Sequence, residues 1–505
     1  TFIHKLSHKK IMNKILYWIG TNFTHYCIAK SIQEKVPNES YAIFDVTNKP
    51  KKFFENENIV NFQKKWFLHE NILDRQKIPD LEYLSEFETK YNIQLSKIIF
   101  SERLFSEFNE FYKFHSNEML RILELECKFY ERVLEEVKPN FVFMFTPYLH
   151  QELLFFKLCK AKGIKTLELN NTKFDSAVIG FDDEIKNYEK FIMNNDVRSF
   201  DKLREYHEKN YMLKSSKKIV KRTELSFSEK ISIGLKYFIF SDNTNAENNF
   251  GYFGRNKIKV FSNYLNNELK VKKRKKFIDS NFKTELDNDK YILFPLQTEA
   301  ESALLIESPL QNNQIEIIKK IAKSMPINYK LIVKEHPMAK SRSWRSIETY
   351  KEMMNIPQVI LLHPEIKVKE IIEKISLVIT ISSNVALDAL FAEKPVMMFA
   401  ENYISVIPSI HKIKNILELP DNIKKMLQEQ VNPVDLEKYI QFSEKISFKF
   451  NPIAFSQDIS DFFHFSGQLV DVEITENKMN IFLEKEKKKI GILSDEYIKK
   501  MSLSN

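Results

Sequence analysis

The sequence predicts an α/β protein in which two Rossmann-type domains face a central cleft and a helical linker joins them. Short apolar runs typical of buried strands alternate with helical patterns in the first third of the chain, and the same alternation returns after residue 286. The residues between these two series are polar and helical, with no clear strand pattern. At roughly 100–200 residues per domain, 505 residues are enough for two to four domains.

The predicted strands of the first series are continuous apolar runs, as expected for strands that are buried on both faces of a parallel sheet. Helical patterns cover Thr24–Lys35, Phe100–Val137 and His150–Lys162, and the last stops at Gly163, a residue suited to the end of a helix. The order strand, helix, strand favours parallel pairing through right-handed crossovers. Strands are predicted at Lys14–Ile19, Tyr41–Val46, Phe141–Phe145 and Ile164–Leu169.

The second series repeats this order, with helices predicted at Asn313–Ser324 and Val385–Ala392. The polar tail after Ser466 contains one hairpin pattern, Leu469–Thr475 with Met479–Leu483. The second series therefore predicts one doubly wound domain followed by a tail. Its strands are predicted at Tyr291–Pro295, Tyr329–Glu335, Val359–Leu362, Leu377–Ile381 and Val396–Phe399.

These patterns divide the chain into four parts. Residues 1–255 form an N-terminal Rossmann-like domain, and residues 256–285 form a basic helical linker. Residues 286–440 form a C-terminal Rossmann-like domain, and residues 441–505 form a C-terminal helix with a charged tail.

Composition excludes several classes of protein. Hydrophobic residues make up 43% of the chain and charged residues 29%, which is typical of a globular protein and not of a disordered one. The chain has 8 glycines, where an average content of about 7% would give roughly 35, so a glycine-rich phosphate loop is not expected. Three widely spaced cysteines give no disulfide framework and no zinc pattern, which indicates a reducing, cytoplasmic environment.

Membrane attachment through a spanning helix or a signal peptide is not predicted. No run of 18 or more apolar residues occurs, and the mildly apolar stretch Ile11–Gly20 lacks a cleavage site. The net charge of +9 is concentrated in basic runs, of which Lys270–Lys276 (KVKKRKK) is the densest. A solvated helix face explains such a run, and attraction to the anionic inner face of the plasma membrane is the functional alternative. Nucleic acid is not an expected partner, because basic and aromatic residues do not interleave as in a known module.

The strongest local feature is the strand-to-helix turn Ser382-Ser383-Asn384. It follows an apolar strand directly and precedes the helical pattern Val385–Ala392. Hydroxyl and amide groups at such a turn take the place of glycines around a bound anion, because backbone N–H groups at a helix start attract negative charge. Ordinary helix capping by Ser383 or Asn384 is the structural alternative.

The second feature is the sequence Lys334-Glu335-His336-Pro337 at the end of a buried strand. Pro337 restricts His336 to an extended conformation, which fixes the direction of the ring. Ligands of open α/β sheets bind outside the carboxyl ends of the strands, so His336 and the serine turn are predicted to face one crevice. There the imidazole donates a hydrogen bond to a leaving phosphate.

Further candidates lie in loops that follow predicted strands. Gln297 follows the first strand of the second domain, and Glu401 is placed to accept from ribose hydroxyls. In the first half of the chain, Glu168 and Asp175 are the candidates for a general base that takes a proton from the acceptor hydroxyl. Other base candidates, with weaker support, are His25, His150 and Glu152. The triplet Asp287-Asn288-Asp289 is typical of a turn, and no metal site is predicted.

Three segments together resemble a known family. FPLQTEAES, LIVKEHP and LVITISSNVALDALFAEKPVMMFAENY, all within Tyr291–Tyr403, resemble the donor half of bacterial capsule-polysaccharide synthesis glycosyltransferases, a group that includes the β-Kdo transferases. The chain departs from the family pattern at Glu393, where glycine is usual, at Asp388, where glutamate is common, and at Glu301, where aspartate is expected.

The resemblance implies a two-domain GT-B glycosyltransferase that needs no metal and no cofactor. It implies that the nucleotide of the donor, CMP in many such enzymes, binds at the second domain. Its phosphate would contact His336, Ser382 and Ser383, with Lys334, Asn384, Glu401 and Gln297 nearby. The acceptor, a surface polysaccharide or a glycolipid, and the catalytic base would then belong to the first half of the chain.

Three other functions remain open at this point, and one of them is sugar-nucleotide epimerisation, which needs no acceptor. Teichoic-acid-type polyol-phosphate transferases share a His-Pro and a Ser-Ser before a helix, so the chain is also consistent with transfer of glycerol phosphate. An envelope-assembly protein that has kept the fold without activity is the alternative outside the enzymes.

Overall fold

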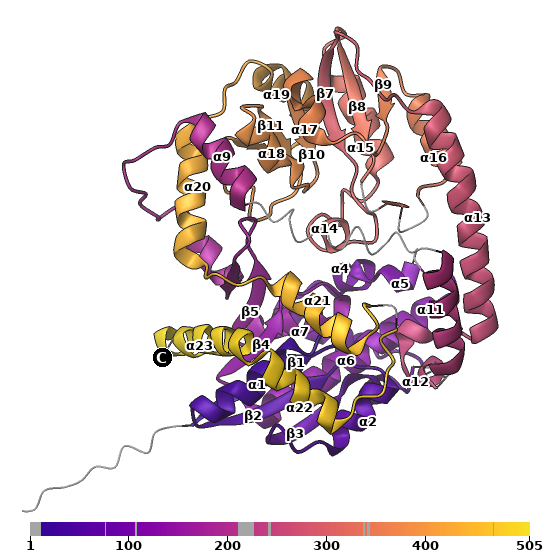
Figure 1. Cartoon of the computed structure of the whole chain (residues 1–505), viewed down its shortest axis with the longest axis vertical. Helices are drawn as coiled ribbons and strands as arrows, with labels where there is room; N and C mark the ends of the chain where they lie inside the picture. Colours follow the sequence, from indigo (N-terminus) through magenta and orange to yellow (C-terminus); the bar gives the residue numbers. More distant parts are fainter. Residues whose placement is uncertain are drawn as a thin grey trace, which may run out of the picture.

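A computed structural model describes residues 12–75, 77–106, 109–210, 227–240, 244–336, 339–340, 344–467 and 469–504. The structure has two lobes, each built on a six-stranded sheet (Figure 1). The α/β architecture with two Rossmann-type sheets is therefore confirmed.

The N-terminal sheet has the strand order β3-β2-β1-β4-β5-β6. All pairs are parallel except β5 with β6, which is antiparallel. The four strands predicted from sequence are present, and two were missed, β3 and β6. The strands are β1 (Asn13–Ile19), β2 (Asn38–Phe44), β3 (Phe62–Phe67), β4 (Phe141–Phe145), β5 (Lys165–Asn171) and β6 (Ala177–Ile179).

The C-terminal sheet has the order β12-β11-β10-β7-β8-β9 and is parallel throughout. In both sheets the first strand of the series lies in the middle and the order reverses beside it, between β1 and β4 and between β7 and β10. Such a reversal point is where open α/β sheets bind ligands, outside the carboxyl ends of the strands. The strands are β7 (Lys290–Pro295), β8 (Tyr329–Lys334), β9 (Val359–Leu362), β10 (Ile375–Thr380), β11 (Val396–Met398) and β12 (Ile410–Lys412).

The helices of the first half include the predicted Thr24–Lys35, and Gly163 takes a positive φ of 68° just past α7, as its predicted place requires. The long helical pattern from Phe100 is interrupted, because residues 109–115 are not helical. The helices are α1 (Thr24–Lys35), α2 (Asn48–Asn56), α3 (Leu81–Tyr91), α4 (Leu95–Ser101), α5 (Arg103–Ser106), α6 (Ser116–Val137), α7 (His150–Ala161), α8 (Phe181–Glu184), α9 (Phe200–Asn210), α11 (Phe227–Phe240) and α12 (Asn245–Asn248).

The helices of the second half begin with the predicted basic linker, which is one 25-residue helix, α13. Its end is buried through Ile278 in the core of the C-terminal lobe. The helices are α13 (Lys257–Asn281), α14 (Ser302–Leu305), α15 (Gln314–Ser324), α16 (Ile347–Met354), α17 (Val368–Ile371), α18 (Val385–Phe391), α19 (Leu419–Met426), α20 (Pro433–Ile446), α21 (Pro452–Phe463), α22 (Glu476–Lys485) and α23 (Lys487–Ser504).

The end of the chain returns to the N-terminal lobe. Phe455 of α21, Phe482 of α22 and Tyr497 of α23 belong to the same hydrophobic core as β1 and β4. The predicted hairpin with Met479–Leu483 as its second strand is therefore wrong, because those residues lie in α22 with Met479 and Phe482 buried. The sequence predicts residues 441–505 as a C-terminal helix with a charged tail; in the structure, the residues up to Ile446 belong to α20, and the helices from Pro452 onward pack in the core of the N-terminal lobe.

The carboxyl ends of the two sheets face each other. Ile306, in the loop after β7, packs against the core of the N-terminal lobe. Tyr403, in the loop after β11, contacts Phe181 with ring centroids 5.6 Å apart. Lys173, just beyond β5, lies over the ring of Tyr403 with its Nζ 4.9 Å from the ring centroid. The loops that carry the predicted donor residues therefore meet the opposite lobe.

The three cysteines Cys27, Cys127 and Cys159 are buried and unbridged. Within the described residues, none of the helices has the length and apolar character that crossing a bilayer requires.

Tyr497 anchors the returning helix. Its ring stacks on Phe143 of β4 with centroids 4.3 Å apart, and its hydroxyl lies 3.0 Å from Nε2 of His25. We expect Tyr497→Ala to lower the free energy of unfolding by about 3–5 kcal/mol, the usual result of deleting a large buried ring. Urea denaturation measures this loss. Leu503→Ala, at a side chain that is 74% exposed in the same helix, is the control, and equal losses in both variants would contradict the anchoring role.

Candidate active site

Gln297 joins the two strands at the reversal point of the C-terminal sheet. Its side-chain Nε2 donates to Oγ of Ser382 at 2.9 Å, and its Oε1 accepts from the backbone N–H of Ser382 at 3.1 Å. The side-chain amide of Gln314 in α15 binds the backbone of Gln297. Its Oε1 accepts from the N–H of Gln297 at 2.8 Å, and its Nε2 donates to the carbonyl of Gln297 at 2.9 Å. All three side chains are buried. The loop after β7 and the turn after β10 are thus fixed to each other by buried hydrogen bonds.

His336 lies on the other side of the same loop. The hydroxyl of Thr298, the residue after Gln297, is 3.3 Å from Nδ1 of His336. Burial lowers the pKa of His336; Glu301 and Glu335 act in the opposite direction, and Arg345 and Lys334 lower it further. The imidazole is therefore neutral near pH 7. Pro337, the residue predicted to set its direction, lies outside the described residues.

The strands that carry His336 and the serine turn are not neighbours, because β7 lies between them, and the two groups are linked through the loop after β7. Both lie at carboxyl ends, of β8 and β10, and the two consecutive residues Gln297 and Thr298 contact one each. The sequence predicted the positions from the ends of the strands alone.

Arg345 and Glu335 hold the strand-end loops in place. The guanidinium of Arg345 pairs with the buried carboxylate of Glu335 and bonds to Glu299 at 3.2 Å, and it also donates to the carbonyl of Gln297. The hydroxyl of Tyr350 donates to Glu335 at 2.6 Å. A buried carboxylate needs such partners, so these contacts fix the backbone on both sides of His336.

The remaining predicted donor residues lie nearby with different surroundings. Lys334 is buried and donates to the carbonyl of Pro364 at 3.1 Å, and burial lowers its pKa to about 8. Ser383 accepts from the N–H of Val385 at 3.3 Å, so the capping alternative holds for this residue. Asn384 is exposed and accepts from the hydroxyl of Tyr403. Glu401 is exposed in the loop after β11.

The N-terminal lobe presents Lys173 to this surface, a residue that the sequence analysis missed. Burial lowers the pKa of Lys173 to about 8, and Glu307 acts in the opposite direction. Glu307 follows α14. Burial raises the pKa of Glu307, while the nearby side chains of Asn402 and Ser382 and the charge of Lys173 act in the opposite direction. Lys173 therefore places a cation from the opposite lobe near the ring of Tyr403 and the carboxyl of Glu307.

Glu152 is a carboxylate of the N-terminal lobe at the start of α7, after β4. Its Oε2 accepts from the N–H groups of Tyr148 and Leu149 at 2.8 and 3.3 Å, at the start of α7. Burial, with the charge of Asp45, raises the pKa of Glu152 to about 7, against the effect of the two backbone bonds. Tyr148 is 51% exposed, and both Glu152 and Glu307 raise its pKa.

A second polar group lies beside Glu152 at the ends of β2 and β3. Asp45 is 2.9 Å from Nε2 of His69 and accepts from Gln151 at 3.1 Å. Burial acts to raise the pKa of Asp45, but these hydrogen bonds and the charges of His69 and His150 outweigh it and the pKa is lowered. Asp45 is therefore ionised, while Glu152 titrates near neutral pH.

The two bases predicted from sequence lie elsewhere. Glu168 is in the middle of β5, where its Oε1 accepts from the N–H of Asp182 at 2.7 Å at the start of α8, and burial raises its pKa to about 7. Asp175 is exposed in the turn after β5 and accepts from Asn451. His25 is buried in the core with its pKa lowered to about 3 by burial.

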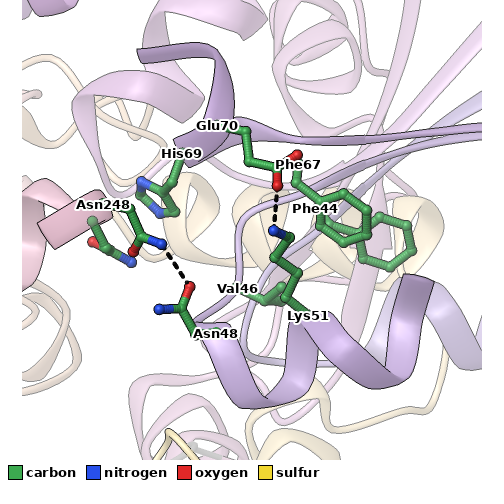
Figure 2. A pocket seen from close by; sticks show the side chains of 9 residues that line it. Phe44, Val46, Asn48, Lys51, Phe67, His69, Glu70 and Asn248 are labelled. Carbon is green, nitrogen blue, oxygen red and sulfur yellow. Dashed lines mark hydrogen bonds and ion pairs between the residues drawn. The ribbon is translucent and has the colours of Figure 1, made fainter. Parts of the chain in front are cut away.

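Neither of the two best-defined cavities contains a predicted site residue. One has a volume of about 10 Å³, the room of a single water, and lies at the ends of β2 and β3 between Lys51, His69 and Asn248 (Figure 2). The other has about 540 Å³ and is lined by His411 and Pro395 at the amino ends of β11 and β12. Ligands of such sheets bind at the carboxyl ends, so the larger cavity lies at the wrong end of the strands for the predicted site.

In the part of the chain that the structure describes, no three His, Cys, Asp or Glu side chains gather as a metal site would require.

The comparisons with known proteins support one family. Residues 206–407 match the model of the family described as capsule polysaccharide biosynthesis protein. This segment contains β7 to β11 with Gln297, His336 and Ser382. The match confirms the resemblance of this segment to capsule polysaccharide biosynthesis proteins. No curated protein matches the chain.

Solved structures with a similar arrangement are distant. UDP-GlcNAc 2-epimerase from Methanocaldococcus jannaschii is 14% identical over 86% of this chain and 99% of its own, with a TM-score of 0.24. The β-Kdo 2,7 transferase KpsC of Thermosulfurimonas dismutans is 10% identical over 61% of this chain and 78% of its own, with a TM-score of 0.28. The N-terminal domain of Candida albicans trehalose-6-phosphate phosphatase is 11% identical over 90% and 97%, with a TM-score of 0.31. Similarities this distant do not indicate a shared function.

His150, the first residue of α7, is a buried imidazole between two carboxylates. Its Nδ1 is 2.5 Å from Glu102 and its Nε2 is 3.1 Å from Glu126. Burial acts to lower the pKa of His150, but the two carboxylates outweigh it and raise the pKa to about 10. The imidazole is thus a charged structural group at neutral pH, and not the base that the sequence suggested.

The raised pKa predicts a pH-dependent stability. A group whose pKa is higher in the folded protein stabilises it fully below its unfolded value and loses that effect as pH rises through the folded value. We therefore expect the difference in free energy of unfolding between wild type and His150→Gln to shrink between about pH 6.5 and pH 10. Urea midpoints across this range measure it, and a difference that stays constant with pH would contradict the assignment.

Proposed function

We propose that this protein is a glycosyltransferase of the GT-B type that moves a sugar from a nucleotide-activated donor, CMP-linked, to a surface polysaccharide or glycolipid. The observation that carries the proposal is the contact of Gln297 with Ser382 and of Thr298 with His336 at the reversal point of the C-terminal sheet. These residues lie in the segment that matches the capsule family. Hydroxyl, amide and imidazole groups at this place suit the phosphate of a nucleotide sugar.

In this proposal the donor phosphate lies between the lobes. Ser382, Ser383 and a neutral His336 donate hydrogen bonds to it from the C-terminal lobe. Lys173 adds positive charge from the N-terminal lobe and offsets the negative charge that develops on the leaving nucleotide. Asn384 and Glu401, exposed at the same edge, would contact the ribose or base. The donor is a substrate, and no cofactor or metal forms part of the proposal.

Glu152 is the general base of the proposed reaction. A base must be deprotonated to take the proton of the acceptor hydroxyl, and it works best when its pKa is near the working pH. Glu152 has a pKa of about 7 and lies at the carboxyl ends of the N-terminal sheet beside the partly exposed Tyr148. Glu168 has a similar pKa, but it lies within β5 and is only 1% exposed, whereas Glu152 is half-buried. Asp175 is bonded to Asn451 away from these strand ends.

The location of the enzyme is proposed to be cytoplasmic and peripheral to the inner face of the plasma membrane. The free cysteines suit a reducing compartment, and the exposed lysines of the run Lys270–Lys276 suit anionic lipid headgroups.

Release of nucleotide from defined donors tests the function. The protein is incubated with CMP-Kdo, another CMP-sugar, a UDP-sugar or CMP-glycerol, with a glycolipid or oligosaccharide acceptor, and the free nucleotide is separated by ion-exchange chromatography. We expect CMP release that depends on the acceptor and on a CMP-sugar. Release from CMP-glycerol alone would instead support polyol-phosphate transfer. No release, together with no shift of Tm by CMP, UDP or GDP, would support an inactive assembly protein.

His336→Ala tests the donor site. We expect kcat to fall by about 10²–10³-fold, as on loss of one transition-state hydrogen-bond donor, with Tm unchanged, because the ring lies at a strand end and not in the core. The control is His411→Ala, which lines the larger cavity at the amino ends of the strands and should leave transfer unaffected. Loss of transfer in His411→Ala but not in His336→Ala would move the donor site to that cavity.

A pair of isosteric variants distinguishes the candidate bases. Wild-type kcat should rise with pH through about 7, because Glu152 must lose its proton. We expect Glu152→Gln to remove this rise and to lower kcat by about 10²–10⁴-fold. The carboxyl of Glu168 also has a pKa of about 7, but Glu168→Gln should keep the rise of kcat with pH and the wild-type value of kcat. If Glu168→Gln loses the pH dependence and Glu152→Gln retains it, the base predicted from the sequence is the correct one.

A further inference from the structure

Two neighbouring helices, α11 and α13, expose an unusual number of large apolar side chains. Soluble monomers seldom expose apolar groups in one continuous area, and such areas usually contact a partner or a membrane. The exposed residues of the two helices are Leu235, Phe238, Ile239, Phe240, Ile258, Phe261, Tyr264, Leu265 and Leu269, with exposed fractions between 41% for Tyr264 and 78% for Ile258.

The two helices lie against each other, so these side chains form one area. The rings of Phe238 and Phe261 meet edge to face with centroids 5.8 Å apart. Nζ of Lys257, at the start of α13, donates to the carbonyl of Phe238 at 2.6 Å. Figure 1 shows α11 beside the lower part of α13, on the outer side of the molecule. We call this area the α11–α13 face.

One stripe of α13 carries apolar residues first and lysines next. At 3.6 residues per turn, its members fall within about 80° of the helix circumference and extend over about 27 Å. The opposite side of α13 holds the helix to the protein, through Asn263 bonded to Glu110, Arg274 bonded to the carbonyl of Trp344, and the buried Ile278. The stripe therefore faces away from both lobes. Its members are Ile258, Phe261, Leu265, Leu269, Lys272 and Lys276.

The charge of α13 is strongly positive. The helix contains eight basic and two acidic residues, and Lys272, Lys273, Lys275 and Lys276 are exposed. The exposed stripe of α13 is apolar from Ile258 to Leu269 and basic at Lys272 and Lys276, so it offers both the apolar side chains and the lysines that bind the surface of an anionic membrane. A second copy of the same face would place these like charges against each other, which disfavours a symmetric dimer here.

We propose that the α11–α13 face docks on a bilayer that contains anionic lipid. The apolar side chains enter the boundary between headgroups and acyl chains, and the lysines contact the lipid phosphates. This inference goes beyond attraction by the run Lys270–Lys276. It also requires the apolar side chains that precede this run in α13, from Ile258 to Leu269. It does not depend on the sugar or the nucleotide of the proposed reaction.

Vesicle cosedimentation of the full chain tests the proposal. Vesicles consist of phosphatidylcholine alone or of phosphatidylcholine with phosphatidylglycerol. We expect binding to the mixed vesicles only, weakened by salt. The variant Ile258→Ser/Leu265→Ser/Leu269→Ser removes apolar side chains, and Lys272→Glu/Lys276→Glu reverses two charges of the same stripe. Each should lower the partition to mixed vesicles by about tenfold or more.

Matched variants elsewhere on the surface control for changes in composition. Ile78→Ser/Ile327→Ser/Leu417→Ser removes three side chains that are 83%, 86% and 83% exposed, and Lys487→Glu/Lys488→Glu makes the same change of charge in α23. Both should bind as wild type does. Equal weakening by a stripe variant and its control would overturn the proposal. So would unchanged vesicle binding by the apolar stripe variant, or a wild-type dimer in size-exclusion chromatography that this variant makes monomeric.

Discussion

The hydrogen bonds between the side-chain amide of Gln297 and Ser382 are the interaction on which the candidate site depends. They connect the two strands, β7 and β10, between which the order of the C-terminal sheet reverses. An amide that is buried without partners costs about 1–3 kcal/mol, and Gln297 and Gln314 avoid this cost only when both loops take their observed positions. The neighbouring residue Thr298 contacts His336. The buried amides therefore set the position of Ser382, while the contacts of Arg345 and Tyr350 with Glu335 set the backbone beside His336.

The proposed donor site would also show how a chain with few glycines can bind an anion. Glycine-rich loops bring backbone N–H groups close to a phosphate because they have no side chains. Here the turn after β10 contains Ser382, Ser383 and Asn384, and the charge comes from Lys173 of the opposite lobe. Side-chain donors replace backbone donors, and the site is then complete only when both lobes contribute.

The sequence predicted the parts of the fold that depend on local pattern. The apolar strands β1, β4, β7 and β10 are buried along most of their length, so their composition reveals them. The edge strand β3 has the sequence FQKKWF with its central residues exposed, and β6 and β12 have three residues each, so neither composition nor length distinguishes them from loops.

The same reasoning separates the candidate site residues that the sequence analysis selected from those that it did not. His336 and Ser382 follow clear strands, and the rule that ligands bind at carboxyl ends is sufficient to select them. Lys173 also follows a predicted strand and was within reach of that rule, whereas Glu307 lies in a loop with no pattern of its own. Glu168 was selected because it is in a strand, but its carboxylate is used at the start of α8. Which of several carboxylates faces the second lobe is a tertiary property that one sequence does not encode locally.

The contacts of Tyr403 with Lys173 and Phe181, which join the lobes at the candidate site, are individually weak. Their strength matters for how a donor would enter. Lys173 lies over the ring of Tyr403, and Phe181 meets the same ring at its edge. A cation over an aromatic ring contributes about 0.5–2 kcal/mol, and an aromatic pair about 0.5–1.5 kcal/mol. By contrast, α21 to α23 are embedded in the N-terminal core through Phe455, Phe482 and Tyr497, and α13 is anchored in the C-terminal core through Ile278. The connections therefore do not depend on the contact of Tyr403 with Lys173, whereas parting the lobes at the carboxyl ends of the sheets would also withdraw Ile306 from the N-terminal core.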